Sequence, residues 1–130
     1  MTPTNYGLPE GSLEDRGYLL FDDDIEQDKL IVFHATPAKN LDGILTDGLH
    51  PGARFGGNLN TISYGEISKD AMIHRHYSET KTTEDWVVLV LKFETRDELY
   101  DNHGTLRSGP LRKQPEIIGV MKIPAGYETY

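Results

Sequence analysis

Apolar residues gather in short runs separated by polar, glycine-rich or proline-containing stretches. The runs at residues 30–33, 86–93 and 117–123 are rich in Val, Ile, Leu and Phe, a composition that favours strands when the run is too short for a helix. The run at 86–93 is almost wholly apolar, so we expect it to be the central strand of a sheet. The first run delivers His34 at its end, and Pro37 and Pro124 are expected to end the first and last strands.

Two segments between these strands carry helical signals. Apolar residues recur at helical spacing over residues 41–45, and Gly48 suits the left-handed residue that closes a helix. Residues 61–64 form a brief strand, after which Ser68 is expected to cap a second helix that runs through Tyr77. Because strands outnumber helices, the pattern predicts an α+β domain.

The remaining stretches are expected to be irregular. Residues 52–58 and about 97–110 are interpreted as loops, and residues 1–15 as a loose arm. Residues 17–21 and 29–33 flank Asp22, Asp23 and Asp24 in a first hairpin. We therefore divide the chain into residues 1–28, an acidic arm and hairpin that is part of the domain or flanks it, and residues 29–130, the domain proper.

Charge is concentrated in the first part of the chain. Residues 1–28 contain eight acidic residues and one arginine, whereas residues 29–130 contain 13 acidic and 12 basic residues. An acidic segment repels phosphate backbones, which argues against nucleic-acid binding by this part. The segment is either a solvated turn or a surface for a basic protein partner.

Composition excludes several kinds of chemistry. The chain has no cysteine, so it holds no disulfide, thiol nucleophile or cysteine-bound zinc. With a mean hydropathy of -0.51 and neither a secretory signal nor a membrane-spanning run, we expect a soluble cytoplasmic protein with no membrane partner. G-x-S-x-G, phosphate-loop and H-E-x-x-H motifs are absent. His74 and His76 are two residues apart, on different helix faces, so we expect no metal site.

Three spaced segments together form the strongest motif. The first runs from Phe33 through His34, Ala35 and Thr36 to Leu49, the second is 62–64 with the helix after it, and the third is 114–120, which begins Gln-Pro-Glu. Their order resembles the histidine-tyrosine-acid branch of the ADP-ribosyltransferase superfamily, including small rifampin ADP-ribosyltransferases and DNA-modifying toxins. Ala35 stands where the family usually has glycine, and Phe33 where it has tyrosine.

The resemblance implies a fold and an activity. The implied fold has two small, mostly antiparallel sheets with about two short helices around an NAD cleft. The implied enzyme cleaves the nicotinamide–ribose bond of NAD, its substrate and only cofactor, and transfers ADP-ribose to a macromolecular or small acceptor. Positive charge then builds on the ribose, and a nearby carboxylate stabilises it.

The resemblance also implies roles for individual residues. Glu116 is the implied acid, Tyr64 stacks on the nicotinamide ring, and His34 donates a hydrogen bond to the adenosine ribose. Ala35 offers its backbone to the nicotinamide amide with Thr36 beside it. The last expected roles are the orientation of the acceptor and binding of the diphosphate, assigned to Gln114 and Arg54.

Alternatives remain open at this point. Asp101 is a rival acid because the rifampin-modifying branch carries an aspartate in the loop after the central strand. An RNA 2'-phosphotransferase shares the implied architecture but needs basic residues for a phosphate. A non-catalytic inhibitor or interaction module is the third reading, with the acidic segment against a basic partner.

Overall fold

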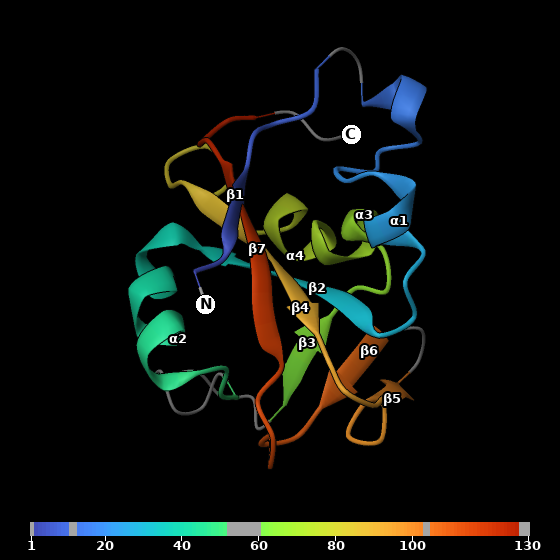
Figure 1. Cartoon of the computed structure of the whole chain (residues 1–130). Coiled ribbons are helices and arrows are strands. Elements are labelled where there is room, and N and C mark those ends of the chain that lie inside the picture. The colour runs from blue at the N-terminus through green and yellow to red at the C-terminus, as the bar shows by residue number, and fades with distance from the viewer. Residues whose placement is uncertain (1, 11–12, 52–60, 103–104, 128–130) are drawn as a thin grey trace.

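The computed structural model describes residues 2–10, 13–51, 61–102 and 105–127, and its architecture is α+β. The larger sheet has four strands in the order β1-β7-β4-β2 (Figure 1). β4 (Trp86–Lys92) pairs with β7 on one side and with β2 on the other, which confirms the prediction that the apolar run at 86–93 is a central strand. The bounds are β1 Thr4–Tyr6, β2 Ile31–Pro37, β4 Trp86–Lys92 and β7 Glu116–Ile123.

A second sheet has three antiparallel strands in the order β3-β6-β5. A single bridge between Phe33 and Gly65 joins it to β2. Two of its strands lie inside the stretch expected to be a loop, so that expectation is wrong. All three residues of β5 are exposed, and a strand that buries nothing carries no apolar alternation. The bounds are β3 Ile62–Tyr64, β5 Tyr100–Asn102 and β6 Thr105–Ser108.

The helices are short. The expected helix after β2 is α2, Leu41–Asp47, which follows a 3-10 turn at Ala38–Asn40 and closes at Gly48 with φ of 85°. The single helix expected from Ser68 to Tyr77 is instead two helices, α3 at Ser68–Ala71 and α4 at Ile73–His76. None of the described helices has the length and apolar character needed to cross a membrane.

The N-terminal segment is part of the main core, so the expectation of a loose arm and hairpin is wrong. β1 pairs in parallel with β7, and Leu13, Leu20 and Phe21 are buried in one hydrophobic cluster with β2 and β4. In place of a hairpin turn, the acidic residues begin α1, Asp23–Glu26, after a 3-10 turn at Glu14–Arg16. Leu20 and Phe21 lie too deep in the core for residues 1–28 to be a separable unit.

A buried carboxylate fastens this segment to α3, which lies beside α1 in Figure 1. Glu26 is 4% exposed, and its oxygens accept hydrogen bonds from the backbone N–H of Phe21 and from the N–H and hydroxyl of Ser68. The Ser68 hydroxyl in turn accepts the N–H of Leu20. Ser68 is therefore the first residue of α3 and a partner of Glu26, whereas the cap position is held by Ile67.

The larger sheet is buried on both faces. One face packs against the N-terminal segment and α3. The other face packs against α2 and the smaller sheet, where Ile44, Leu49 and Tyr64 meet Leu89 of β4. The residues that form the candidate site lie along the margin of this second cluster.

Candidate functional site

A cleft of about 380 Å³ opens where the second half of β2 faces α2, β3 and α4. It will be called the cleft. None of its described lining residues is acidic, and three of them are histidines. The lining consists of His34, Ala35, Thr36, Pro37, Asn40, Ile44, Leu49, His50, Thr61, Ile62, Ser63, His74, Ser78 and Trp86.

His34 is held in one orientation by β3. Its Nδ1 lies 2.7 Å from the carbonyl oxygen of Ser63, and because a carbonyl only accepts, Nδ1 carries the proton. Burial lowers the pKa of His34, and the charge of His74 lowers it further, so the ring is neutral at pH 7. In a neutral imidazole the other nitrogen, Nε2, is then an acceptor. Nε2 of His34 is therefore able to accept a hydrogen bond but not to donate one, whereas the sequence-based expectation made His34 a donor.

Ala35 presents its backbone to the cleft. Phe33 exchanges both backbone hydrogen bonds with Gly65, so its N–H and C=O point away from β4. Successive residues of an edge strand point their N–H and C=O groups to alternate sides. Ala35 lies two residues after Phe33, so its N–H and C=O point the same way as those of Phe33, away from β4. No described strand pairs with β2 on that side beyond Phe33. Ala35 thus offers one donor and one acceptor to whatever occupies the cleft.

The neighbouring walls are fixed by local hydrogen bonds. The hydroxyl of Thr36 accepts a bond of 3.0 Å from the side-chain amide of Asn40. Nε2 of His50 lies 2.8 Å from the carbonyl oxygen of Asp47, at the end of α2. These contacts join the end of β2 to the 3-10 turn that follows it, and the end of α2 to the cleft rim.

Tyr64 lies in the core and is not among the residues that line the cleft. The side chain is 3% exposed, and its ring centroid lies 6.1 Å from that of His34 and 5.9 Å from that of Phe93. Its hydroxyl is 2.8 Å from that of Ser108. Burial, together with the charge of Glu98, raises the pKa of Tyr64 to about 12. The ring therefore has no open face for nicotinamide stacking, although it does adjoin His34 as expected.

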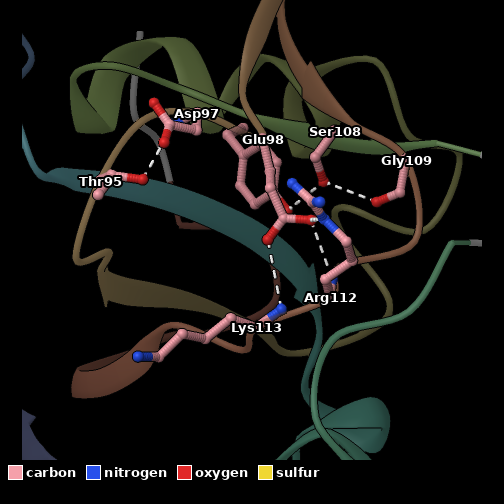
Figure 2. A network of polar contacts seen from close by, with 8 residues as sticks. Thr95, Asp97, Glu98, Ser108, Gly109, Arg112 and Lys113 are labelled. Carbon is pink, nitrogen blue, oxygen red and sulfur yellow. Dashed lines mark hydrogen bonds and ion pairs between the residues drawn. The ribbon is translucent and has the colours of Figure 1, made fainter.

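A second hollow of about 700 Å³, here called the groove, lies at the opposite end of β4. Figure 2 shows the polar network around Glu98, one of the residues that line the groove: one carboxylate oxygen accepts the backbone N–H and Nε–H of Arg112 and the other accepts the N–H of Lys113. These bonds lower the pKa of Glu98. The groove is lined by Leu30, Lys92, Phe93, Glu94, Thr95, Asp97, Glu98, Arg112, Lys113, Gln114, Pro115 and Glu116.

The structure does not bring Glu116 to His34. Glu116 pairs with Lys92, and Lys92 with Ile31, whereas His34 belongs to a row three residues away along β2. Residues an odd number apart in a strand project from opposite faces, so the two side chains leave opposite faces of the sheet. Asp101 is exposed on β5 and is likewise absent from the cleft lining. Arg54 lies outside the described residues.

Gln114 has a contact that differs from its expected role. Its side-chain amide accepts the N–H of Leu49 at 2.8 Å and donates to the carbonyl of the same residue at 2.9 Å. A Cβ added at Gly48 would lie 2.7 Å from the Gln114 amide carbon, so the close approach needs glycine there. Gln114 therefore clamps the end of α2, and this clamp positions Leu49 and His50 in the cleft wall.

Two residues of this region are not found by the sequence reasoning: Ser63, which holds His34, and Glu98, which holds the loop at 112–113. Neither has a motif of its own. The sequence marks Arg107 only as local positive charge together with Arg112 and Lys113, whereas the structure places its side chain against Thr61. In the described part of the chain, no group of metal-ligating side chains is close enough to hold an ion.

Comparison of this chain with protein-family models, with curated proteins and with solved structures finds no match. The geometry of the cleft is therefore the basis for the functional argument.

Proposed function

We propose that the protein is an NAD-dependent ADP-ribosyltransferase and that NAD occupies the cleft. The reaction cleaves the bond between nicotinamide and ribose and transfers ADP-ribose to an acceptor. The domain would then have the ADP-ribosyltransferase fold, with β2 as the strand that carries the histidine.

The observation that carries the proposal is the unpaired backbone of Ala35. A carboxamide such as that of nicotinamide has one carbonyl and one NH₂ group, and it pairs with an adjacent N–H and C=O of an extended strand. The small side chain of Ala35 lets the ligand approach closely. Next to it, the neutral His34 supplies an acceptor for a ribose hydroxyl. An amide and a hydroxyl are thus recognised by consecutive residues of β2.

The acid of the reaction requires a separate assignment. Glu116 and Asp101 are the sequence candidates, and neither lines the cleft. Glu98 is ionised, but it lines the groove, where its oxygens accept hydrogen bonds from Arg112 and Lys113, and it does not line the cleft either. Activity measurements on all three carboxylates therefore have to identify the group that stabilises positive charge on the ribose.

Nicotinamide release from NAD, measured on the full chain with each carboxylate replaced, identifies the acid. Replacing the carboxylate that stabilises the ribose is expected to reduce the rate by about a hundredfold, the usual size of such an electrostatic contribution. Glu116→Gln tests the acid that the resemblance implies, and Asp101→Asn and Glu98→Gln are the matched alternatives. Full activity in all three variants would reject each of these carboxylates as the acid.

Binding is tested without catalysis. NAD at a hundred times its Kd is expected to stabilise the folded protein by about 2.7 kcal/mol. Ala35→Pro removes the N–H that points away from β4 and should abolish this stabilisation, whereas Ala35→Ser should retain it. If NAD stabilises neither the unmodified protein nor Ala35→Ser, the proposal fails.

One observation favours the RNA 2'-phosphotransferase as a second candidate. The described lining of the cleft has no carboxylate that would repel a phosphate, which suits this ligand better than the near-neutral composition suggested. Removal of a 2'-phosphate from an RNA oligonucleotide in the presence of NAD would identify this reaction. Nicotinamide release without phosphate transfer would reject it.

A non-catalytic module is tested through the acidic segment. Asp22, Asp23 and Asp24 are exposed and accessible to a basic partner. Deleting residues 1–28 would remove core residues, so replacing these three aspartates with asparagine is the appropriate variant. If that variant releases nicotinamide normally, the segment is not needed for activity, and loss of a bound partner would indicate a module.

A further inference from the structure

Arg107 is the starting point because no carboxylate of the described residues compensates its charge. It lies on β6, is partly buried, and makes one hydrogen bond, from Nη1 to the hydroxyl of Thr61 at 3.0 Å. Its Nε is buried and has no partner among the described atoms. Burying a charged group without a counter-charge lowers the stability of the folded protein, so a partly buried arginine is usually paired with a carboxylate or an anion.

Three of the other described arginines have a counter-charge in the protein, since Arg16, Arg96 and Arg112 each pair with a carboxylate. The buried Arg75, like Arg107, has an Nε without a partner among the described atoms, but it donates to two backbone carbonyls. Among the described residues, Arg107 has neither a carboxylate nor a backbone carbonyl as a partner.

The surroundings of Arg107 belong to the cleft. Thr61, its hydrogen-bond partner, lines the cleft, and so does Ser63, which pairs with Arg107 across the β3–β6 ladder. His74 of α4 lines the same end of the cleft. Burial lowers the pKa of His74, and the charge of Arg107 lowers it further. Arg107 itself is not among the lining residues and borders the cleft through Thr61.

We propose that Arg107, His74 and Thr61 form an anion subsite that receives a phosphoryl group of the nucleotide in the cleft. The guanidinium plane matches two phosphate oxygens, the hydroxyl donates to a third, and the imidazole adds a donor. The nucleotide's identity rests on the proposed function, whereas the subsite rests on the unpaired charge of Arg107. Arg107 then takes the diphosphate role first expected of Arg54.

Calorimetric titration of the full chain with ADP and with adenosine tests the subsite, because the two ligands differ only in the diphosphate. The unmodified protein is expected to bind ADP about ten- to a hundredfold more tightly, the range for a charge-assisted hydrogen bond. Arg107→Gln should bring the two affinities together, and Arg107→Lys should keep part of the difference. Arg112→Gln is the matched control, since Arg112 lies in the groove, and it should keep the full difference.

Two results would overturn the subsite. One is equal affinity of the unmodified protein for ADP and adenosine, which needs no variant. The other is a full preference for ADP in Arg107→Gln. The outcome is independent of the enzyme proposal: Arg107-dependent ADP binding without nicotinamide release supports the subsite and rejects the reaction. Nicotinamide release with the same KM in Arg107→Gln supports the reaction and rejects the subsite.

Discussion

The cleft and the groove differ in how their charges are balanced. In the groove, Arg112 pairs with Glu98 and Lys113 with Glu94, so its cations have partners in the protein. In the cleft the imidazole of His34 is neutral, and Arg107, which borders the cleft, has no carboxylate partner among the described residues. Charges that are paired internally hold loops in place, whereas unpaired polar groups are free to bind a ligand. Charge balance therefore favours the cleft as the ligand site that we propose, although the groove has the larger volume.

A single aromatic wall separates the two regions. Tyr64 contacts His34 on the cleft side, and Phe93, which lines the groove, on the other. The effects of substitutions in the cleft and in the groove can therefore be compared with the effects of substitutions at Tyr64 itself.

Removing the wall should have the largest effect. Tyr64→Ala deletes a ring that is 3% exposed and is expected to cost about 3–5 kcal/mol of unfolding free energy, because it leaves a cavity between cleft and groove. Tyr64→Phe keeps the ring, loses the bond to Ser108 and should cost about 1 kcal/mol. Urea denaturation measures both. Equal stabilities of the two variants would mean that the ring does not support the two regions.

Releasing the clamp on the cleft rim should have the next largest effect. Gln114→Ala removes two hydrogen bonds to Leu49 and is expected to cost about 1–3 kcal/mol. NAD-dependent stabilisation should fall as well, because Leu49 and His50 line the cleft. Gln114→Glu keeps the acceptor and loses the donor, so it should be intermediate. Normal NAD binding by Gln114→Ala would confine the clamp to a purely structural role.

Acidification should distinguish the cleft from the groove. The pKa of folded His34 lies below the value of 6.5 for an unfolded histidine, so the unfolded state binds the proton more readily. The stability that His34 contributes is therefore complete above pH 6.5 and is lost as the pH falls through the folded pKa. His34→Asn keeps a donor for the Ser63 carbonyl without titrating, and it should show a smaller loss between pH 7 and 5. Identical pH profiles would contradict the buried neutral imidazole.

The smallest effect is expected at the exposed side of the groove. The Arg112 side chain is 85% exposed, so Arg112→Gln should change the unfolding free energy by no more than about 0.5 kcal/mol. Its backbone N–H still binds Glu98 in this variant. A loss of several kcal/mol would show that the ion pair, and not the backbone contact, holds the loop.

The sequence predicts the elements that bury a continuous apolar face. β2, β4 and β7 lie where the runs at 30–33, 86–93 and 117–123 place them, and α2 follows from its spacing and Gly48. β1 and β5 are not predicted because each is three residues long and mostly exposed, so their pairing depends on strands distant in sequence.

The candidate site shows the same division. The sequence identifies His34, Ala35 and Thr36 because the apolar run at 30–33 and Pro37 predict the strand and its end from adjacent residues alone. It does not identify the roles of Glu98, Arg107 and Gln114, since each is defined by a partner 14 to 65 residues away in sequence.

The amino-acid sequence alone determined the α+β class, the central strand and the segment that carries the histidine, because these follow from short-range apolar periodicity and turn chemistry. Tertiary structure alone decided that Glu116 leaves the opposite face of the sheet from His34, that Tyr64 is buried, and that Arg107 has no counter-charge among the described residues. The physical reason is that face, burial and charge balance depend on sheet register and on neighbours from remote segments.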